Sequence, residues 1–511
     1  MSAAIVLLQA RACGLRPLAP PELKIEAFGT TSPRMALEFR TPVGPVLVLD
    51  DVSDGALHLS ALFVIAKDEQ PPPVVAPDGE APAVLLSGYD HAAVWRARFT
   101  LPADRPSAYS WNDTTYEVAS DIGGDLRLAY VSCNGEETGD MDREGSERNA
   151  MWNRLRDEHR RRPFALMLHG GDQIYADELT EGHELSRDWP ERIPRDPSRA
   201  ALADLGHHLR ERFFERYCAL YSAPQFAWLA ARVPSLMQWD DHDICDGWGS
   251  LRRTRTCSPV GQKLFAVARE SCLVFQHAAS DGDLPARFSN LAGQHLGWAI
   301  HGPGLRILAP DMRSERTRRQ IMGTGGWAMM EAEAKREVHG RTLLMSSVPL
   351  LGPRLSLLET VMVLIPRMQK YEDDLRDQWQ SRAHRDEWRR MLRLVGNLAG
   401  KDGHDITSIS GEIHLATRAV MEFGDGLHLN QLVASGIAHR APPRGWARFL
   451  GALSWLGEDP LPEYPIRIER LPGQANRYVA ERNYLILERT GGQWNARWDL
   501  EKSGMTPPLA L

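Results

Sequence analysis

Short runs of alternating apolar and polar residues, separated by turn residues, occupy the first part of the chain. This alternation is typical of β-strands with one buried face. We therefore expect an N-terminal β-sandwich domain over residues 1–124, ending at a Gly-Gly linker. A carbohydrate- or protein-binding module is the functional alternative for this part. The expected strands are Ala36–Arg40, Pro45–Leu49, Ala56–Ile65, Ala93–Leu101 and Thr114–Val118.

Between residues 125 and 442, short apolar runs alternate with longer segments that have helical periodicity. This order of elements is the signature of an α/β fold. A Ser258 cap followed by Pro259 marks the start of one of the helices. We predict strands at Leu126–Val131, Phe164–Leu168, Ser235–Trp239, Leu305–Leu308, Thr342–Met345, Ile406–Ile409 and Gln431–Ala434. We predict helices at Ala200–Tyr221, Pro259–His277, Trp327–Val338 and Tyr371–Leu398.

The last part of the chain, residues 443–511, carries a β-hairpin signal. Two strand-like runs, Tyr484–Arg489 and Trp494–Leu500, flank the turn sequence Thr490-Gly491-Gly492. We expect a β-rich C-terminal extension that packs on the core and completes or covers a sheet.

Length and composition limit the possible classes of protein. A chain of 511 residues exceeds the roughly 250 to 300 residues of a single core, so two or three structural units are expected. With 43% hydrophobic and 25% charged residues, the composition is that of a soluble globular protein, and no apolar run is long enough for a membrane helix. The formal charge of −7 disfavours binding of long polyanions and leaves small phosphorylated substrates open.

The cysteines and the N-terminus indicate a reducing compartment. Six cysteines without a CxxC pair argue against a disulfide scaffold and against a zinc ribbon. The apolar stretch Ala3–Leu8 is short and lacks a basic start, which makes it a poor export signal. We therefore expect a cytoplasmic enzyme without a membrane partner.

Residues with metal-binding side chains follow four of the predicted central strands. Ligands of α/β proteins gather beyond the carboxyl ends of the strands, so these four loops are expected to converge in one cleft. Their thiol, carboxylate, phenol and imidazole groups together indicate a metal site. The segments are Ser132–Gly135, His169–Asp177, Asp240–Asp243 and Ser410–His414.

Each segment also has a structural interpretation when it is taken alone. A Gly-Gly-Asp turn is common in tight loops, a lone cysteine after a strand is usually a small buried apolar residue, and Tyr175 is alternatively a core aromatic. The three carboxylates around His242 are more specific, because they would repel one another without a cation. A helix cap with a solvated loop is the alternative there. Glu412 and His414 stand two positions apart, which places both side chains on one face of an extended segment.

The ordered set of motifs resembles the alkaline phosphatase D (PhoD-like) family, a branch of the calcineurin-like metallophosphoesterases. The resemblance spans roughly Leu126 to Pro442. It implies a four-layer α/β/β/α catalytic core behind an N-terminal β-sandwich, and hydrolysis of phosphoesters by water activated on two or more metal ions. The motifs are Ser132-Cys133, Gly171–Asp177, Trp239–Asp243, Asp311-Met312-Arg313, Asp373–Trp379, Ser410–His414 and Ala434–Ile437.

The resemblance also implies the metal ligands. Asp172 would bridge the ions, one iron(III) and one divalent ion, for which calcium is expected first and manganese, zinc or magnesium are alternatives. The position that matches Glu412 is usually an aspartate in the family. Iron would be bound by Cys133, Tyr175 and His414, and the second ion by Asp241 and Glu412.

Two further residues are catalytic candidates. By the resemblance, His242 faces the phosphate as general acid or as a stabiliser of charge. Arg313 is expected to contact a substrate phosphate, and a structural pair of Asp311 and Arg313 is the alternative.

We therefore predict attack of metal-bound hydroxide on a phosphomonoester or phosphodiester. A nuclease on the same scaffold is the competing enzyme, although the acidic net charge argues against a nucleic-acid partner. A metal-stabilised binding protein without catalysis is the competing non-enzyme. The oligomeric state does not follow from the sequence.

Overall fold

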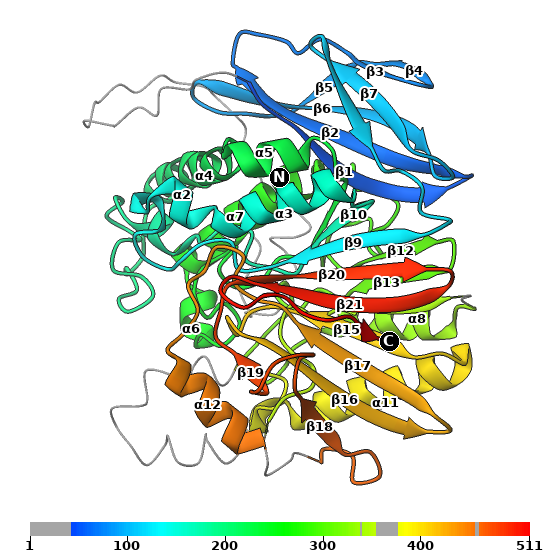
Figure 1. The fold of residues 1–511 in the computed structure, drawn as a ribbon. Helices are drawn as coiled ribbons and strands as arrows, with labels where there is room; N and C mark the ends of the chain where they lie inside the picture. The colour runs from blue at the N-terminus through cyan, green and yellow to red at the C-terminus, as the bar shows by residue number, and fades with distance from the viewer. Residues whose placement is uncertain (1–41, 338–339, 354–376, 455–458) are drawn as a thin grey trace.

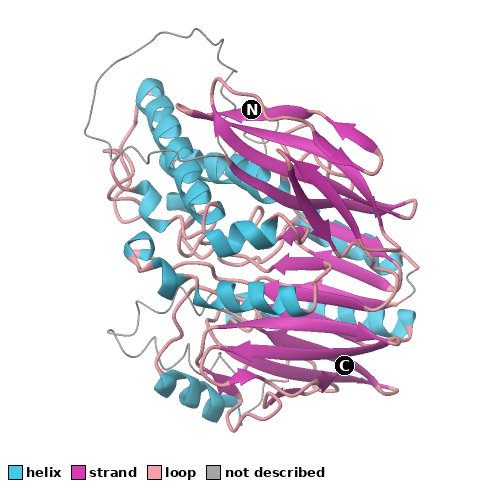
Figure 2. Cartoon of the chain, turned by 45° about the horizontal axis from the view of Figure 1, so that its top comes forward, coloured by secondary structure: helices cyan, strands magenta, loops and turns pink. Residues whose placement is uncertain are grey.

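Three β-sheets organise the residues that the computed structural model describes, which are 42–337, 340–353, 377–454 and 459–511. Their strands are stacked from the top to the bottom of the molecule (Figures 1 and 2). The predicted strand Ala36–Arg40 lies outside the described residues. The first sheet has the order β22 (Gly504–Met505), β21 (Gln493–Leu500), β20 (Asn483–Thr490), β9 (Leu126–Val131), β10 (Leu166–His169), β11 (Ser235–Met237), β1 (Val43–Ser53), β2 (Ala56–Ala66), β6 (Ala92–Pro102) and β5 (Ala83–Gly88), with β23 (Leu509–Ala510) beside β21.

The N-terminal strands continue this first sheet. Strand β1 pairs in parallel with β11, with Val48 opposite Ser235. A second layer lies against β2 and β6, because Phe63 stacks on Trp111 with ring centroids 4.5 Å apart. The domain boundary at residue 124 stays a prediction. The second layer is the sheet β4 (Gly79–Ala81), β3 (Val74–Ala76), β7 (Ser107–Trp111) and β8 (Thr114–Val118).

The predicted C-terminal hairpin is confirmed as β20 and β21, and it completes the first sheet. Strand β20 pairs antiparallel to β9, with Leu485 opposite Tyr130. Strands β9, β10 and β11 are parallel to one another and consist almost entirely of buried residues. Continuous apolar runs of this kind suit strands that are covered on both faces. Their carboxyl ends therefore meet at one edge of the sheet.

The third sheet packs on the first. The Trp298 indole donates to the Met237 carbonyl (2.8 Å) and the Trp498 indole donates to the Val433 carbonyl (2.9 Å), so side chains cross between the sheets in both directions. Strands β13, β14, β15 and β17 are parallel in this sheet. It has the order β12 (Trp298–Gly302), β13 (Leu305–Ala309), β14 (Arg341–Met345), β15 (Ile406–Ser410), β17 (Leu427–Val433), β16 (Ala416–Gly424) and β18 (Ile466–Glu469), with β19 (Tyr478–Val479) beside β16.

Helices pack against the first and third sheets. α3, α5 and α7 contact strands of the first sheet, and α11 contacts β15 and β17 of the third. α7 begins where it was predicted, because the Ser258 hydroxyl accepts from the Gly261 amide (3.1 Å). The helices are α2 (Gly145–Arg148), α3 (Ala150–Arg161), α4 (Arg199–Tyr221), α5 (Pro224–Ala230), α6 (Arg253–Thr256), α7 (Pro259–His277), α8 (Thr324–Lys335), α11 (Arg385–Asp402) and α12 (Arg444–Leu453), and the 3-10 turns are η1 (Asp140–Asp142), η2 (Asp177–Thr180) and η4 (Arg382–His384).

The predicted helix Tyr371–Leu398 was wrong at its start. Residues 371–376 lie outside the described residues, and the chain from Asp377 to His384 forms turns before α11 begins. Asp377 is bound by the buried guanidinium groups of Arg313 and Arg316, and Ser381 caps η4. These contacts stabilise a non-helical path that helical periodicity does not reveal. Among the helices in the described ranges, none has both the length and the apolar character that a membrane span requires.

Candidate metal centre

The four predicted loops converge, and hydrogen bonds join the first two of them directly. The Cys133 amide donates to the Gly171 carbonyl (3.2 Å), and the Asn134 amide donates to the Asp172 carbonyl (2.9 Å). The loop after β17 joins them, since the His439 amide donates to the Cys133 carbonyl (3.1 Å). The parallel course of β9 and β10 brings these loops to the same edge, as expected for an α/β sheet.

Four of the predicted metal ligands have left-handed backbone conformations. The φ angles are 54° at Cys133, 54° at Asp172, 65° at Glu412 and 54° at His414. Residues with a Cβ atom populate this region rarely and at a cost of about 1–3 kcal/mol each, and such residues cluster at functional sites. Gly171 allows the close approach of two loops, because its φ is 116° and an added Cβ would lie 2.6 Å from Asp240 Cβ.

A buried carboxylate cluster forms the centre of the site. Oxygens of Asp172, Asp240 and Asp241 lie within 4.8 Å of one another, and all three residues are buried. One oxygen of each has no hydrogen-bond partner in the described structure. Burial, followed by the charge of Asp240, raises the pKa of Asp172 well above its ordinary value. The Arg313 guanidinium pairs with Asp240 and Asp241, whereas Asp172 forms no ion pair with a described residue. Buried carboxylates are costly unless cations balance them, so this donor set fits a metal ion.

The other predicted ligands lie in pairs around this cluster. The Cys133 thiol is 3.3 Å from Asp172 Oδ2, and the Tyr175 hydroxyl is 3.1 Å from His414 Nε2. Burial raises the pKa of both Cys133 and Tyr175, so a bound cation is needed to hold either group as an anion. Glu412 is fixed by Gln378, whose amide nitrogen donates to Oε2 (2.6 Å).

Arg313 lies beside the carboxylate cluster, bound to its carboxylates, and not at the cavity where we expected it. Its guanidinium is fully buried, donates to Asp377 (2.6 and 3.0 Å) and to Asp240, and lies 3.3 Å from Asp241 Oδ1. It does not line the cavity described below. Three carboxylates surround the guanidinium in this structure, and the expected contact with a substrate phosphate stays a prediction. Asp311 contacts Arg313 through the backbone amide, which donates to Asp311 Oδ1 (2.9 Å), and it also accepts from the Trp239 indole and the Leu296 amide.

His242 forms an ion pair with Asp177, a residue for which the motifs predicted no role of its own. Its Nδ1 lies 3.0 Å from Asp177 Oδ2, and its ring stacks on Tyr175 with centroids 4.3 Å apart. Burial alone would lower the pKa of His242, but the carboxylates of Asp177 and Asp241 outweigh burial and raise that pKa well above its ordinary value. These carboxylates favour the protonated imidazole, the form that can donate a proton.

Asp243 holds two of the loops together and is not part of the carboxylate cluster. Its carboxylate accepts from the backbone amides of Asp172 (2.9 Å), Gln173 (3.0 Å), Ile174 (3.2 Å) and Asp240 (2.9 Å), and from Gln276 Nε2 (2.9 Å). The sequence placed Asp243 among repelling carboxylates. The structure shows that its charge is compensated by N–H groups.

We expect Asp243→Asn to lower the free energy of unfolding by about 2–5 kcal/mol. The new NH2 group would face at least two backbone N–H donors, since each oxygen of Asp243 accepts from two or more groups. Urea unfolding followed by circular dichroism measures the change. Asp188→Asn removes the same charge at an exposed position and should alter stability by less than about 0.5 kcal/mol. Equal stability of the two variants would contradict the assigned role.

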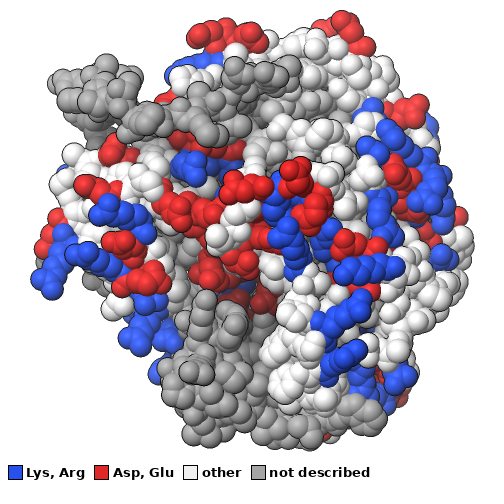
Figure 3. All heavy atoms as spheres, turned by 60° about the vertical axis from the view of Figure 1, so that its left-hand side comes forward, with Lys and Arg blue, Asp and Glu red and all other residues white. Residues whose placement is uncertain are grey.

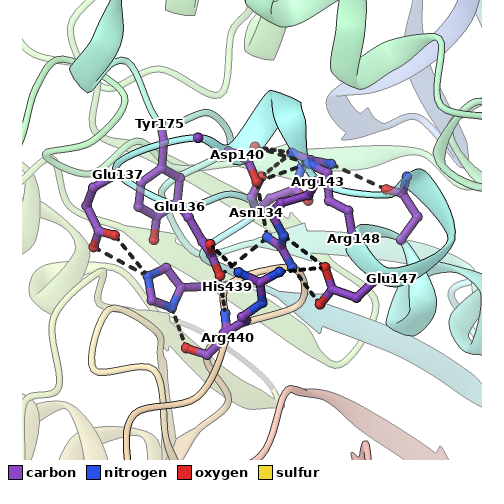
Figure 4. A network of polar contacts seen from close by, with 12 residues as sticks. Asn134, Glu136, Glu137, Asp140, Arg143, Glu147, Arg148, Tyr175, His439 and Arg440 are labelled. Carbon is purple, nitrogen blue, oxygen red and sulfur yellow. Dashed lines mark hydrogen bonds and ion pairs between the residues drawn. The ribbon is translucent and has the colours of Figure 1, made fainter.

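A polar network that the sequence did not predict supports the His414 side of the centre (Figure 4). His439 stacks on His414 with centroids 3.4 Å apart and rings within 8° of parallel, and its Nε2 lies 3.3 Å from the Glu137 carboxylate. The next residue, Arg440, donates to Glu136 and Glu147 (both 3.1 Å). This network ties the loop after β9 to the loop after β17. Its residues lie far apart in sequence, so no local motif marks them.

The centre opens into a cavity of about 570 Å³. Asp172, Asp241, His242, Glu412 and His414 all line it. Figure 3 shows Asp and Glu side chains gathered around a hollow on one face of the molecule. Five of the predicted site residues thus share one solvent-connected space, and Cys133 and Tyr175 adjoin it through their contacts with Asp172 and His414.

Comparison with known proteins identifies structures with a similar fold and a related sequence. Two solved structures have a similar fold: PhoD (TM-score 0.55, 13% identity, 92% of this chain and 88% of that chain covered) and a purple acid phosphatase from yellow lupin, Lupinus luteus, seeds (TM-score 0.52, 11% identity, 91% and 73% covered). An uncharacterized protein of Saccharomyces cerevisiae is 27% identical over 353 residues, which are 56% of this chain and 49% of the yeast protein. The chain spans about half the length of this curated relative.

The sequence pattern of one family matches residues 114–371, which make up half of the 511 residues. The match begins at β8 and includes the loops of Cys133, Asp172 and Asp241. The resemblance inferred from the strand-end motifs is thereby confirmed, and the chain belongs to the family of PhoD-related phosphatases.

Proposed function

We propose that this phosphatase hydrolyses small phosphomonoesters or phosphodiesters at a centre of two metal ions. The observation that carries the proposal is the buried cluster of Asp172, Asp240 and Asp241, of which Asp172 and Asp241 line a cavity that His242 also lines. A small phosphorylated substrate fits this cavity, and a nucleic acid does not fit the acidic surroundings. Membership of a phosphatase family supports the reaction class.

Two kinds of donor favour two different ions. Thiolate and phenolate are strong anionic ligands that suit iron(III), so Cys133, Tyr175 and His414 would bind iron. Oxygen donors suit a divalent ion, so Asp241 and Glu412 would bind calcium, or alternatively manganese, zinc or magnesium. Asp172 would bridge the two, and Asp240 is a further candidate through its unpaired Oδ2. When bound, such a pair of ions lowers the pKa of water to about 7 and stabilises charge on the phosphoryl group.

The residues of this chain would orient the substrate and supply the proton. His242 lines the cavity as a cation that is held by Asp177, so it is placed to protonate the leaving oxygen. Asp243 and the left-handed backbone of Asp172 fix the direction of the bridging carboxylate. The stacked His439 and its partner Glu137 fix the His414 ring.

We also infer that the catalytic core has the four-layer α/β/β/α architecture and that the N-terminal strands form a β-sandwich. Helices on the outer faces of the first and third sheets, together with the indole contacts between these sheets, support the four layers. The stacking of Phe63 on Trp111 and the tilted ring contact between Phe99 and Tyr109 support the sandwich.

Metal analysis combined with a substrate screen tests the proposal. Purified protein should contain iron and a divalent ion, and should hydrolyse para-nitrophenyl phosphate or bis-para-nitrophenyl phosphate. Chelation should abolish turnover, and adding the ions back should restore it. Metal-replete protein without activity on either ester would favour a metal-stabilised binding protein.

Tyr175→Phe tests the iron assignment. The substitution removes only the oxygen donor and conserves nearly all the packing volume, so changes should come from the metal. We expect the visible charge-transfer band of the purified protein to weaken or shift and the iron content to fall, with thermal stability lowered only by the lost metal linkage. Cys133→Ser should perturb the same band independently. Unchanged colour, iron content and turnover in Tyr175→Phe would make Tyr175 a core aromatic.

A further inference from the structure

Part of the wall of the metal-centre cavity is apolar. Leu351 follows β14, Trp446 and Leu450 come from α12, and Tyr478 comes from β19, and all four line the same cavity as Asp172 and His242. Three prolines, Pro349, Pro353 and Pro442, also line it. These apolar side chains come from segments that are distant in sequence, so the fold gathers them beside the acidic centre.

Helix α12 presents an aromatic ring at this wall. Ala447 and Leu450 of the helix are buried, whereas Trp446 keeps 37% of its surface exposed. Trp446 stacks on Phe449 with centroids 5.5 Å apart, which stabilises its orientation. A tryptophan that is held in place and still exposed at a cavity offers a large apolar contact area to a ligand.

The cavity contains no basic side chain among its described lining residues. Apart from Tyr478, its titratable lining consists of carboxylates, His242 and His414, and burial lowers the pKa of His414 well below its ordinary value. One phosphate would be balanced by the metal ions, but among the described lining residues a second phosphate on the substrate would meet carboxylates and no Lys or Arg. The charges therefore disfavour substrates with several phosphates. The carboxylates are Glu137, Asp172, Asp241, Asp246, Asp377 and Glu412.

We propose that the substrate carries a single phosphate and an extended apolar group, and that this group binds against Leu351, Trp446, Leu450 and Tyr478. The proposal rests on the function proposed above and adds the substrate class. The phosphate end would lie at the carboxylate cluster, and the apolar end would cover the exposed ring of Trp446.

A series of alkylphosphonates tests this subsite without turnover. Methyl-, butyl- and octylphosphonate have the same charged group and differ only in chain length. Titration calorimetry on the metal-loaded protein should give a Kd that falls at least about tenfold from methyl to octyl, since a fully buried methylene strengthens binding roughly fourfold. Methylenediphosphonate, with two phosphonates and no chain, should bind more weakly than butylphosphonate. Equal affinities across the alkyl series would overturn the proposal.

Variants of α12 test whether the dependence of Kd on chain length arises at Trp446. Trp446→Ala should reduce the methyl-to-octyl ratio of Kd values at least about fivefold, and Trp446→Phe should keep most of it, because a ring remains. Arg448→Ala, on the exposed face of the same helix and outside the cavity lining, should leave the ratio unchanged. An equal loss in Arg448→Ala and Trp446→Ala would refute the subsite. Hydrolysis of bis-para-nitrophenyl phosphate is measured in a separate assay. If affinity rises with chain length but the ester is not hydrolysed, the proposed reaction is refuted and the apolar subsite is not.

Discussion

Asp172→Asn is expected to lower turnover by at least about two orders of magnitude while leaving the fold largely intact. The carboxylate belongs to the cluster with Asp240 and Asp241, and its Oδ1 accepts no hydrogen bond from the described residues. Replacing one oxygen by an NH2 group removes a bridging donor and one negative charge. Because the surrounding loops are held by Asp243 through backbone amides, the loss should fall on metal binding rather than on folding. Steady-state kinetics of the purified variant measure the loss of turnover, and its metal stoichiometry measures the loss of metal binding.

Asp499→Asn is the matched control for this variant. Asp499 is also buried, accepts from the Tyr484 hydroxyl (2.7 Å) and pairs with Arg154, but it does not line the metal-centre cavity. It should keep wild-type metal content and turnover even if its stability falls. If Asp172→Asn keeps full metal occupancy and wild-type turnover, the central assignment of the site is wrong.

The sequence predicted those parts of the site that follow directly from a strand. Cys133, Asp172 and Asp241 each stand within a few residues of a short apolar run, and parallel strands bring such positions to one edge of a sheet. The strands themselves were predictable because their residues are buried on both faces. Glu412 and His414 were predicted by the same reasoning, although they follow a strand of the third sheet.

Contacts between distant segments could not be predicted in this way. Arg313 was expected at the substrate because a single sequence shows its charge but not the three carboxylates that surround it. The partner of His242 was equally hidden, since Asp177 lies 65 residues earlier. Helical periodicity placed α11 too early, because the pattern of apolar residues continues through the turns near Trp379, which is buried although it lies outside the helix.

His242→Ala should lower turnover by about 10² to 10⁴ with little loss of metal. The ring is bound by Asp177 on one side and stacks on Tyr175, so it reaches the cavity without being needed as a ligand. Kinetics of the variant, together with its metal content, separate catalysis from metal binding. Loss of all metal in His242→Ala would instead make His242 a metal ligand.

Asp177→Asn tests the role of His242 as proton donor through the pH dependence of turnover. The Asp177 carboxylate, 3.0 Å from Nδ1, favours the imidazolium and raises the pKa of His242. Since the proton donor is the charged form, turnover should be retained below that pKa and lost as pH rises through it. Removing the carboxylate lowers the pKa, so the alkaline limb of the kcat profile should move to lower pH by about one to three units.

The effect should be specific to the contact and not to net charge. Asp188→Asn changes the charge of the protein by the same amount at an exposed site and should leave the alkaline limb in place. Bound cations would neutralise the neighbouring Asp172 and Asp241, whereas Asp177 contacts the ring and the Asp246 amide and would keep its charge. Asp177 should therefore dominate the pKa of His242 in the metal-loaded enzyme. An alkaline limb at the same pH in Asp177→Asn and wild type would show that a group other than His242 donates the proton.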